Sequence, residues 1–490
     1  MKKHILTTLI GLLISFYSFS QSTLADVEQQ VFQTDKNMEI EGEVGYLQVP
    51  ENRKNPSSRK VKVKYVRLKS LAANPGKPIV YLEGGGGSVT WQAEDPDALT
   101  DWLDYLEIAD LIFIDRRGTN DESLIYVWQN EFPENFFVTE EAANLHYKKM
   151  VEASLKTFDE RGIDVTGYTI EEHAKDVDDL MTALGAESYS MVGFSFGSHI
   201  GMTVMKLFPD RIEKAVMIGS DAPNQSLNYP RYLHEHIRKI AEMVKADNAL
   251  SQTVPDFEAL VNRVMKKLAQ NPVTVTIKNP LTGADMELKI GAFGLALILR
   301  LDIDDYNDIP IIPRLLYTIE QGDYSMLTWF AQKRVVFSLA VPGNGINQQL
   351  ASGASTSRWA QIEKEAGESI FGNVVNFPFS AAKPHWVSNP LSFDPSAPLR
   401  SDIPTLFITG DMDCRTPVAQ VEETKKGFSN AKHIIVKNAG HEQAMWDDEV
   451  ANEMIPNFLK DGKVKKTDAY YGDIEFIKVS GKAEGHPSIE

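Results

Sequence analysis

The sequence predicts an α/β protein in which a mostly parallel sheet carries helices on both faces and a large, mainly helical unit is inserted. Short apolar runs typical of buried strands alternate with segments of helical periodicity up to about residue 221. The alternation lapses over residues 222–399, where helical patterns dominate. It resumes with the apolar run at residues 405–409, so an insertion into one α/β domain is the simplest account.

Composition excludes several classes of protein. The 490 residues are 43% hydrophobic and 24% charged, an ordinary mixture for a globular protein. The 50 Lys and Arg residues against 68 Asp and Glu residues give a formal net charge of −18, and no basic block offers a stripe for a phosphate backbone. We therefore expect no nucleic-acid partner. The single cysteine, Cys414, excludes an intramolecular disulfide and a cysteine-rich zinc site.

The first 20 residues have the pattern of a signal peptide. Lys2 and Lys3 precede an apolar run over residues 5–19, and Ser18-Phe19-Ser20 supplies small residues at the expected cleavage site. A membrane anchor is the alternative, but the run contains hydroxyl residues and is shorter than the ~20 apolar residues that a span needs. We expect an exported protein, periplasmic or secreted, with no membrane attachment after cleavage.

The elements of the predicted sheet follow in chain order. A capping box, Thr169-Ile170-Glu171-Glu172, opens a helix whose apolar residues recur at helical spacing up to Gly185. Other strands are expected at residues 61–68, 77–82, 111–114, 189–193, 215–218, 405–409 and 433–436, and a further helix at 198–208. In the insertion, helices are expected at 232–244, 257–269 and 311–321, and a hairpin at 273–290; residues 470–479 are consistent with one edge strand.

These elements predict four parts of the chain. The signal peptide occupies residues 1–20, the α/β core residues 21–221 and 400–460, and the inserted cap residues 222–399, followed by a C-terminal extension over 461–490. A cap inserted there would cover the carboxyl ends of the strands, where ligands of α/β sheets bind.

The most informative motif is Gly193-Phe194-Ser195-Phe196-Gly197, which lies between a predicted strand and a predicted helix. This is the context of a nucleophile elbow, a sharp turn that exposes a reactive serine and requires small residues two positions before and after it. Ser195 is therefore the expected nucleophile. The N–H of Phe196, at the start of the helix, is an expected donor to an oxyanion.

A reactive serine needs a histidine base, and His441 is the best placed, in a Gly-His pair just after the strand at 433–436. His199 lies one helical turn beyond Ser195, and we expect it to pack against the sheet or solvent. His234 and His236 suggest a metal site, but their spacing on a helix turns the two rings apart. We expect no metal and no cofactor.

The histidine in turn needs an acid, and in this fold class the order along the chain is serine, acid, histidine. Asp411 and Asp413 both follow the strand at 405–409. Asp413 lies further into the loop, where it can reach across the top of the sheet, and is the preferred acid; the alternative is that both aspartates only cap the next turn. The neighbouring Cys414 is expected to be a small packed residue.

A second oxyanion donor is expected in the glycine run at residues 84–87, which follows the strand at 77–82. Glycine lets the backbone approach a reacting carbonyl closely, and Gly85 is the preferred donor. A flexible glycine turn with no role in catalysis is the alternative.

The chain resembles the α/β-hydrolase superfamily, and within it the proline-iminopeptidase and tripeptidyl-aminopeptidase family of serine peptidases. The resemblance rests on Tyr81-Leu82-Glu83-Gly84-Gly85-Gly86-Gly87-Ser88, Asp115-Arg116-Arg117-Gly118-Thr119, the elbow at Ser195, the loop Gly410-Asp411-Met412-Asp413-Cys414-Arg415-Thr416-Pro417, and Gly440-His441. It covers about residues 40–460, and implies a helical cap and the roles of nucleophile, acid and base for Ser195, Asp413 and His441. The chain departs from the family at Glu83-Gly84-Gly85-Gly86-Gly87, where His-Gly-Gly-Pro-Gly is usual, and at Asn120, where a glycine is usual.

The resemblance implies an aminopeptidase, which must bind the ammonium group of its substrate. Carboxylates of the cap would do so, and Glu235, Asp305 and Glu320 are the candidates. We expect an exported serine hydrolase that releases residues or short peptides from free N-termini through an acyl-enzyme on Ser195. The alternative is a carboxylesterase that acts on small esters with the same three residues. A binding protein on an inactive hydrolase scaffold is disfavoured, because all three residues are present in order.

Overall fold

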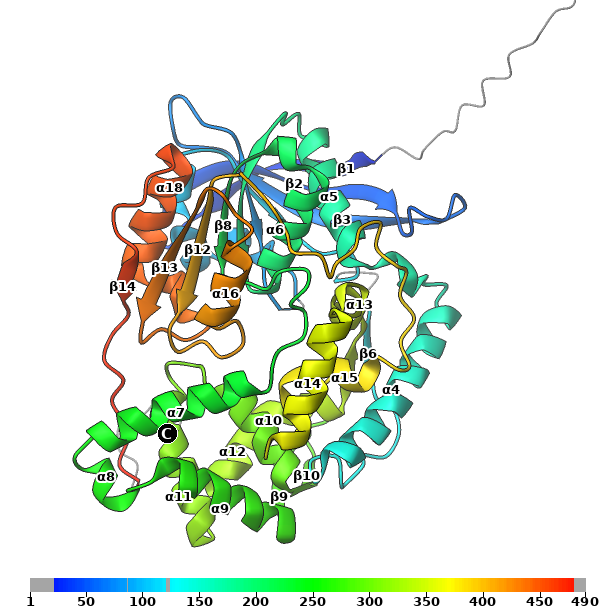
Figure 1. Cartoon of the computed structure of the whole chain (residues 1–490). Helices are drawn as coiled ribbons and strands as arrows, with labels where there is room; N and C mark the ends of the chain where they lie inside the picture. Colours follow the sequence, from blue (N-terminus) through cyan, green and yellow to red (C-terminus); the bar gives the residue numbers. More distant parts are fainter. Residues whose placement is uncertain (1–21, 86, 120–123, 480–490) are drawn as a thin grey trace, which may run out of the picture.

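The computed structural model describes residues 22–85, 87–119 and 124–479, which form a sheet-containing core and a helical cap (Figure 1). The predicted signal peptide lies outside the described residues, and so does Asn120. Within the described ranges, no helix combines the length and the apolar character needed to cross a bilayer.

The core is built on one ten-stranded sheet with the order β1-β2-β3-β5-β4-β7-β8-β12-β13-β14. The three pairings from β1 to β5 are antiparallel and the six from β5 to β14 are parallel. The strands are β1 Thr23–Gln33, β2 Glu39–Pro50, β3 Lys60–Leu68, β4 Ile79–Leu82, β5 Leu111–Ile114, β7 Tyr189–Phe194, β8 Ile212–Ile218, β12 Thr405–Gly410, β13 Ala431–Lys437 and β14 Asp468–Tyr470. The predicted α/β class with a mostly parallel sheet is confirmed.

Helices cover both faces of this sheet, because each face presents its own apolar surface (Figure 1). Val80 and Met191 point to the face covered by α5 Ile170–Ala183, α6 Phe196–Leu207 and α16 Val418–Lys425. Tyr81 and Val192, the next residues along the same strands, point to the other face. That face is covered by α1 Trp91–Glu94, α2 Pro96–Thr100, α3 Leu103–Leu106, α17 Gln443–Trp446 and α18 Ile455–Asp461. Thr169 caps α5 as predicted, since its hydroxyl accepts a hydrogen bond from the Glu172 N–H, whereas the Glu172 carboxylate, expected to complete the capping box, pairs with Arg53.

The cap is mainly helical and packs around a separate apolar cluster. Its helices are α4 Glu140–Glu160, α7 Arg231–Ala246, α8 Leu250–Thr253, α9 Phe257–Gln270, α10 Ala292–Asp302, α11 Ile312–Gln321, α12 Ser325–Arg334, α13 Gly343–Ser352, α14 Thr356–Glu368 and α15 Phe379–Ala382. The predicted helices at 232–244, 257–269 and 311–321 are α7, α9 and α11. The predicted hairpin is β9 Val273–Lys278 with β10 Asp285–Ile290.

The cap also contains a segment that the sequence placed in the core. Strand β6 Ile125–Val127 pairs with β11 Ala340–Pro342 of the insertion, and α4 packs on α15. Tyr147 on α4 contacts the Phe377 ring of the insertion, with the ring centroids 5.3 Å apart. The predicted core range of residues 21–221 is corrected here, because helical periodicity shows that α4 has an apolar face but not which apolar surface covers it.

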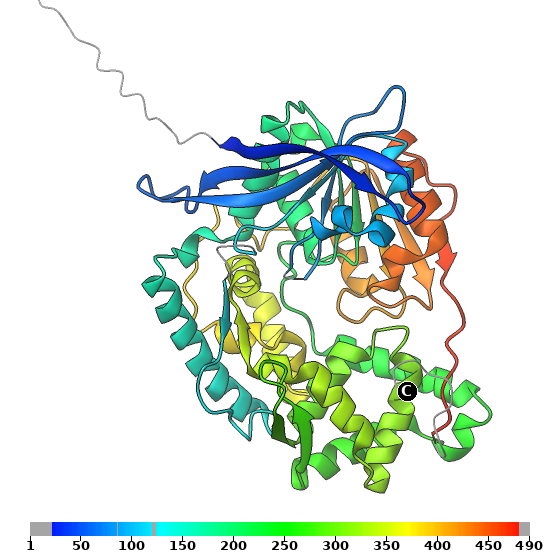
Figure 2. The ribbon, with the colours of Figure 1, turned by 180° about the vertical axis from the view of Figure 1, so that it is seen from behind.

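The C-terminal segment joins the core to the cap (Figure 2). The edge strand β14 ends at Tyr470, so the strand expected at 470–479 is shorter and earlier than predicted. Residues 471–479 continue without regular secondary structure, and the Ile477 N–H donates to the Pro310 carbonyl oxygen of the cap at 3.3 Å. Ile474, Phe476 and Ile477 pack against the apolar cluster of the cap.

Candidate active site

Ser195 forms the sharp turn between β7 and α6. Its backbone has φ 51° and ψ −123°, a conformation that side chains rarely adopt. A β-carbon on Gly193 would lie 2.7 Å from the Gly197 carbonyl oxygen, and one on Gly197 would lie 1.8 Å from the Leu82 carbonyl oxygen. Both glycines are therefore required by close backbone contacts, as the elbow motif predicts.

Three side chains from separate loops meet at the turn. Ser195 Oγ lies 2.8 Å from His441 Nε2, and His441 Nδ1 lies 2.7 Å from Asp413 Oδ2. Ser195 follows β7, Asp413 follows β12 and His441 follows β13, so all three lie at the carboxyl ends of parallel strands. His441 and Asp413 are 4% and 2% exposed, which shields their interaction from solvent.

The Asp413 carboxylate is fixed by its own loop. Oδ1 accepts hydrogen bonds from the backbone N–H groups of Arg415 and Thr416, each at 2.8 Å, and Oδ2 accepts one from the Thr416 hydroxyl. Asp411 points elsewhere and accepts from the Asn438 N–H at 2.7 Å. The structure therefore brings Asp413, and not Asp411, to the histidine.

Burial and the charge of the partner shift the pKa in opposite directions, both for Asp413 and for His441. Burial alone would raise the pKa of Asp413, but His441 and the Thr416 hydrogen bonds outweigh it and hold that pKa below the ordinary value. Burial alone would lower the pKa of His441, but Asp413 outweighs it and raises that pKa above its ordinary 6.5. The pair favours an ionised aspartate beside a histidine that can accept a proton.

The predicted oxyanion donors lie beside Ser195. The N–H of Phe196 belongs to the first turn of α6, where no intrahelical acceptor exists. Gly85 follows β4 with φ +56° and lines the same cavity as Ser195 and Phe196. The Gly84 N–H is already used, since it donates to Glu83 Oε1 at 2.8 Å, whereas the Gly85 N–H donates to no group among the described residues.

A cavity of about 620 Å³ lies above these residues, between the core and the cap. Much of its cap side is apolar or aromatic, formed by Phe337, Val375, Phe377 and Phe379. A cavity of this volume matches a ligand of drug-like size.

The three cap carboxylates proposed from the sequence do not line this cavity. Glu320 Oε1 instead accepts from Arg263 Nε at 2.6 Å, beside a separate surface hollow. Asp305 Oδ1 caps the Asn307 N–H at 2.8 Å, and Glu235 lies half-buried on α7. Their assignment to substrate binding is corrected, because the spacing of residues along the chain does not reveal which side chains of the cap turn toward Ser195.

The cavity has ionisable residues that the sequence analysis missed, among them Glu83, Asp221 and Arg300. Asp221 follows β8 as Asp413 follows β12, so its place at a strand end was a usable signal. Its Oδ1 accepts from Gln420 Nε2, and burial raises its pKa to about 7. Glu83 accepts from the Gly84 N–H, the Tyr81 hydroxyl and Gln92 Nε2.

The remaining histidines have other contacts. His199 Nε2 lies 2.9 Å from Ser352 Oγ, and burial lowers the pKa of His199 to about 3. His236 Nε2 lies 2.6 Å from the Ile303 carbonyl oxygen, and His234 contacts Ser369. The described residues contain no group of three His, Cys, Asp or Glu placed to hold a metal ion. Burial raises the pKa of the Cys414 thiol, so it is a poor nucleophile.

Family comparison assigns the fold. The profile of the alpha/beta hydrolase fold matches residues 77–448, so the chain belongs to this family of hydrolases. A tripeptidyl aminopeptidase from Streptomyces lividans is 22% identical over 217 residues. That match covers 40% of this chain and 39% of the relative, so the chain spans well under half the length of the relative.

Two solved structures are among those similar to this chain. A proline iminopeptidase-related protein from Thermus thermophilus is 13% identical with a TM-score of 0.34, and covers 89% of this chain and 97% of its own. An esterase from Exiguobacterium antarcticum is 13% identical with a TM-score of 0.35, and covers 89% of this chain and all of its own, 100%.

Proposed function

We propose that the protein is a serine hydrolase that transfers an acyl group to water through an ester on Ser195. The observation that carries this proposal is the hydrogen-bonded series Ser195, His441 and Asp413, of which Ser195 and His441 line the cavity. His441 Nε2 takes the Ser195 proton as Oγ attacks the substrate carbonyl carbon, and then gives that proton to the leaving group. Water, activated by the same nitrogen, hydrolyses the acyl-enzyme.

The oxyanion of each tetrahedral intermediate would lie between the amides of Phe196 and Gly85. Fixed N–H donors stabilise charge that develops in the transition state without having to reorganise. Asp413 holds the imidazole in the tautomer with the proton on Nδ1, so that Nε2 faces the serine, and stabilises the imidazolium.

We further propose that the substrate is a short peptide with a free N-terminus. The Asp221 carboxylate supports this, because it lines the cavity and has one oxygen engaged by Gln420. An ammonium bound there would favour the ionised carboxylate. The name of the Streptomyces lividans relative agrees with such a substrate.

A carboxylesterase is the second candidate, and a specific observation favours it. The three predicted cap carboxylates are not in the cavity, whose cap side is mostly apolar, and Glu83 already accepts three hydrogen bonds. An esterase with the same three residues needs no site for an ammonium group.

The test is a panel of peptidyl arylamides, with free or acetylated N-termini, assayed beside short-chain aryl esters. An aminopeptidase cleaves the free amides and loses at least tenfold in kcat/KM on acetylation, whereas an esterase cleaves only the esters. Ser195→Ala should lower turnover on every substrate by on the order of 10⁴–10⁶. A variant that keeps a tenth of the wild-type rate would show that the nucleophile lies elsewhere.

Export is also a proposal, and it rests on the first 20 residues of the sequence. Expression of the full chain in a bacterial host, followed by N-terminal sequencing, tests it. We expect a mature chain that begins near Gln21 in the periplasm or medium; an uncleaved chain retained in the cell would contradict it.

A further inference from the structure

Arg300 is a cationic residue in the wall of the candidate active site. It lies near the C-terminal end of the cap helix α10, and lines the cavity together with Ser195 and His441. The preceding part of α10 is buried and apolar, from Leu295 to Leu299, so Arg300 is the first charged side chain after a hydrophobic segment.

The carboxylates near Arg300 are bound to other cations. Asp304 Oδ1 accepts from Arg415 Nε at 3.1 Å and lies 3.0 Å from Arg415 Nη2. Asp302, on α10 itself, pairs with Arg334 and with Lys333. Across the described ranges, no hydrogen bond or ion pair engages the Arg300 guanidinium.

The surroundings of Arg300 make it a receptive site for an anion. Burial, together with the positive charge of the nearby Arg415, lowers the pKa of Arg300 to about 10, although Asp304 acts in the opposite direction. The group still carries its charge at neutral pH. A desolvated charge without a partner is costly, and an anion that reaches it from the cavity removes that cost.

We propose that Arg300 binds a carboxylate of the substrate, so that the enzyme prefers short substrates that carry a free carboxylate group. The proposal rests on the proposed hydrolase function, whose substrate class it narrows. Two parallel N–H donors of a guanidinium match the two oxygens of a carboxylate. Three carboxylates, Glu83, Asp221 and Glu442, also line the cavity, and its second arginine, Arg415, is paired with Asp304. This surplus of negative charge disfavours a doubly charged phosphate, so a singly charged carboxylate is the better match.

This assignment gives the cavity opposite charges at two points. The Asp221 carboxylate lies on the core side and the Arg300 guanidinium on the cap side. A short unblocked peptide carries an ammonium at one end and a carboxylate at the other. Such a zwitterion satisfies both groups, whereas a neutral ester satisfies neither.

Substrate pairs that differ only in a carboxylate test the proposal on both sides of the scissile bond. One pair is a tripeptide and its C-terminal amide, and the other is the mono-aryl ester of succinic acid and the aryl ester of monomethyl succinate. We expect wild-type kcat/KM to be tenfold to a hundredfold higher for the carboxylate member of at least one pair. Arg300→Gln should remove that difference and leave kcat/KM for the neutral member within about threefold of the wild-type value.

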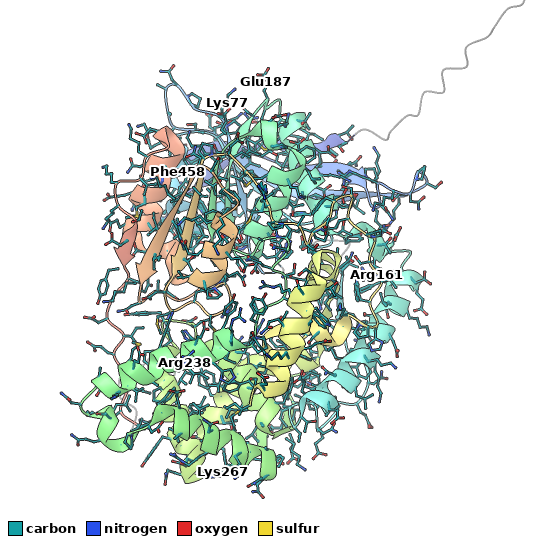
Figure 3. The ribbon with its side chains drawn as sticks, viewed as in Figure 1. Lys77, Arg161, Glu187, Arg238, Lys267 and Phe458 are labelled. Carbon is teal, nitrogen blue, oxygen red and sulfur yellow. The ribbon has the colours of Figure 1, made fainter. Side chains whose placement is uncertain are left out.

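The matched control is Arg238→Gln. Arg238 is an exposed arginine of the cap helix α7 that does not line the cavity (Figure 3). Arg238→Gln removes one positive charge, as Arg300→Gln does, so a general electrostatic effect on kcat/KM would appear in both variants. The proposal would be overturned if the wild type cleaved both members of each pair with the same kcat/KM. It would also be overturned if Arg238→Gln removed the preference for the carboxylate member as fully as Arg300→Gln does.

A binding measurement separates this proposal from the hydrolase function. Succinate is titrated into the Ser195→Ala protein with and without Arg300→Gln, and the dissociation constants are compared by calorimetry. We expect the second substitution to weaken succinate binding at least tenfold, and Arg238→Gln to leave it unchanged. If the wild-type protein cleaves no substrate, yet succinate binds and the binding depends on Arg300, only the hydrolase function is contradicted. If succinate does not bind, or binds equally well after Arg300→Gln, this proposal is contradicted.

Discussion

Gly84 lies directly against Ser195, so that a β-carbon on Gly84 would be 2.7 Å from the β-carbon of the serine. The same β-carbon would lie 3.1 Å from the Phe194 carbonyl oxygen. The glycine loop after β4 and the elbow after β7 are therefore fitted to each other. This contact explains a glycine at position 84 by packing, whereas position 85 needs one because of its positive φ.

Gly84→Ala should displace the serine and lower activity. The added methyl group meets Ser195 and backbone atoms that cannot rotate away, so the nucleophile shifts relative to His441 and to the oxyanion amides. A displacement near 1 Å costs about a hundredfold in rate. We expect kcat/KM to fall by roughly that factor, measured on the best substrate, with the circular dichroism spectrum preserved. The control is Gly367→Ala on α14, an exposed position with open space around it. If Gly84→Ala keeps activity within twofold of wild type, the packing account is contradicted.

The two aspartates after β12 should differ sharply in their effects. Asp413→Asn is nearly isosteric but removes the charge beside His441 and favours the wrong tautomer of the ring. The same change in a serine protease lowers kcat by about 10⁴, and we expect a comparable loss here. Asp411→Asn removes a charge that does not contact His441 and keeps an oxygen that can accept from the Asn438 N–H, so we expect less than a tenfold loss. Steady-state kinetics of both variants decide this, and the opposite ranking would identify Asp411 as the acid.

The local parts of the site could be predicted because each follows a strand. Ser195, Asp413 and His441 were found from a turn motif and from polar residues just after apolar runs, and parallel strands bring such positions together. The cap could not be predicted in the same way. Glu235 and Glu320 lie on amphipathic helices whose periodicity fixes an apolar face, but the direction of that face depends on packing between helices that are distant in sequence.

Arg117 shows a different limit of sequence reasoning. The segment Asp115-Arg116-Arg117-Gly118 marked the family resemblance, yet the structure gives Arg117 a role in stability. Its guanidinium is fully buried, donates to both oxygens of Asp176 at 2.6 Å, and also donates to the carbonyl oxygens of Glu51 and Gly167 at 2.7 Å. It thereby joins the end of β5 to α5 and to the end of β2.

Arg117→Met should destabilise the fold strongly. The substitution leaves the Asp176 carboxylate buried with one of its two arginine partners, Arg53, and removes the donors to two carbonyl oxygens. Breaking a buried ion pair from one side costs about 3–5 kcal/mol. Urea denaturation measures the free energy of unfolding. The matched control Lys148→Met breaks an exposed pair with Glu152 on α4 and should change the free energy of unfolding by no more than about 0.5 kcal/mol. Equal effects of the two substitutions on that free energy would refute the role of Arg117.

The pH profile on a neutral ester should report on His441. The histidine acts as a base only when it is neutral, and Asp413 raises its pKa above the ordinary 6.5 against the effect of burial. Activity is therefore lost as the pH falls through that raised pKa, with kcat/KM decreasing tenfold per pH unit below it. In Asp413→Asn the residual activity should persist to lower pH, because the charge that favours the imidazolium is gone. A midpoint that does not move between the two proteins would show that another group controls this limb.

The pH profile on a free-amine peptide should contain a second ionisation, that of Asp221. Burial raises the pKa of this carboxyl to about 7, and a protonated carboxyl has no charge with which to bind an ammonium group. As the pH falls below 7, an aminopeptidase loses both the ionised Asp221 and the neutral His441, so kcat/KM on the peptide falls with a slope near two, against a slope of one on the ester. Asp221→Asn should lower peptide cleavage by roughly tenfold to a hundredfold at pH 8, leave ester cleavage within about threefold, and reduce the slope on the peptide to one. If the acid limbs of the two pH profiles are identical and the Asp221→Asn variant cleaves peptide at the wild-type rate, Asp221 does not bind the ammonium group. That result would favour the esterase.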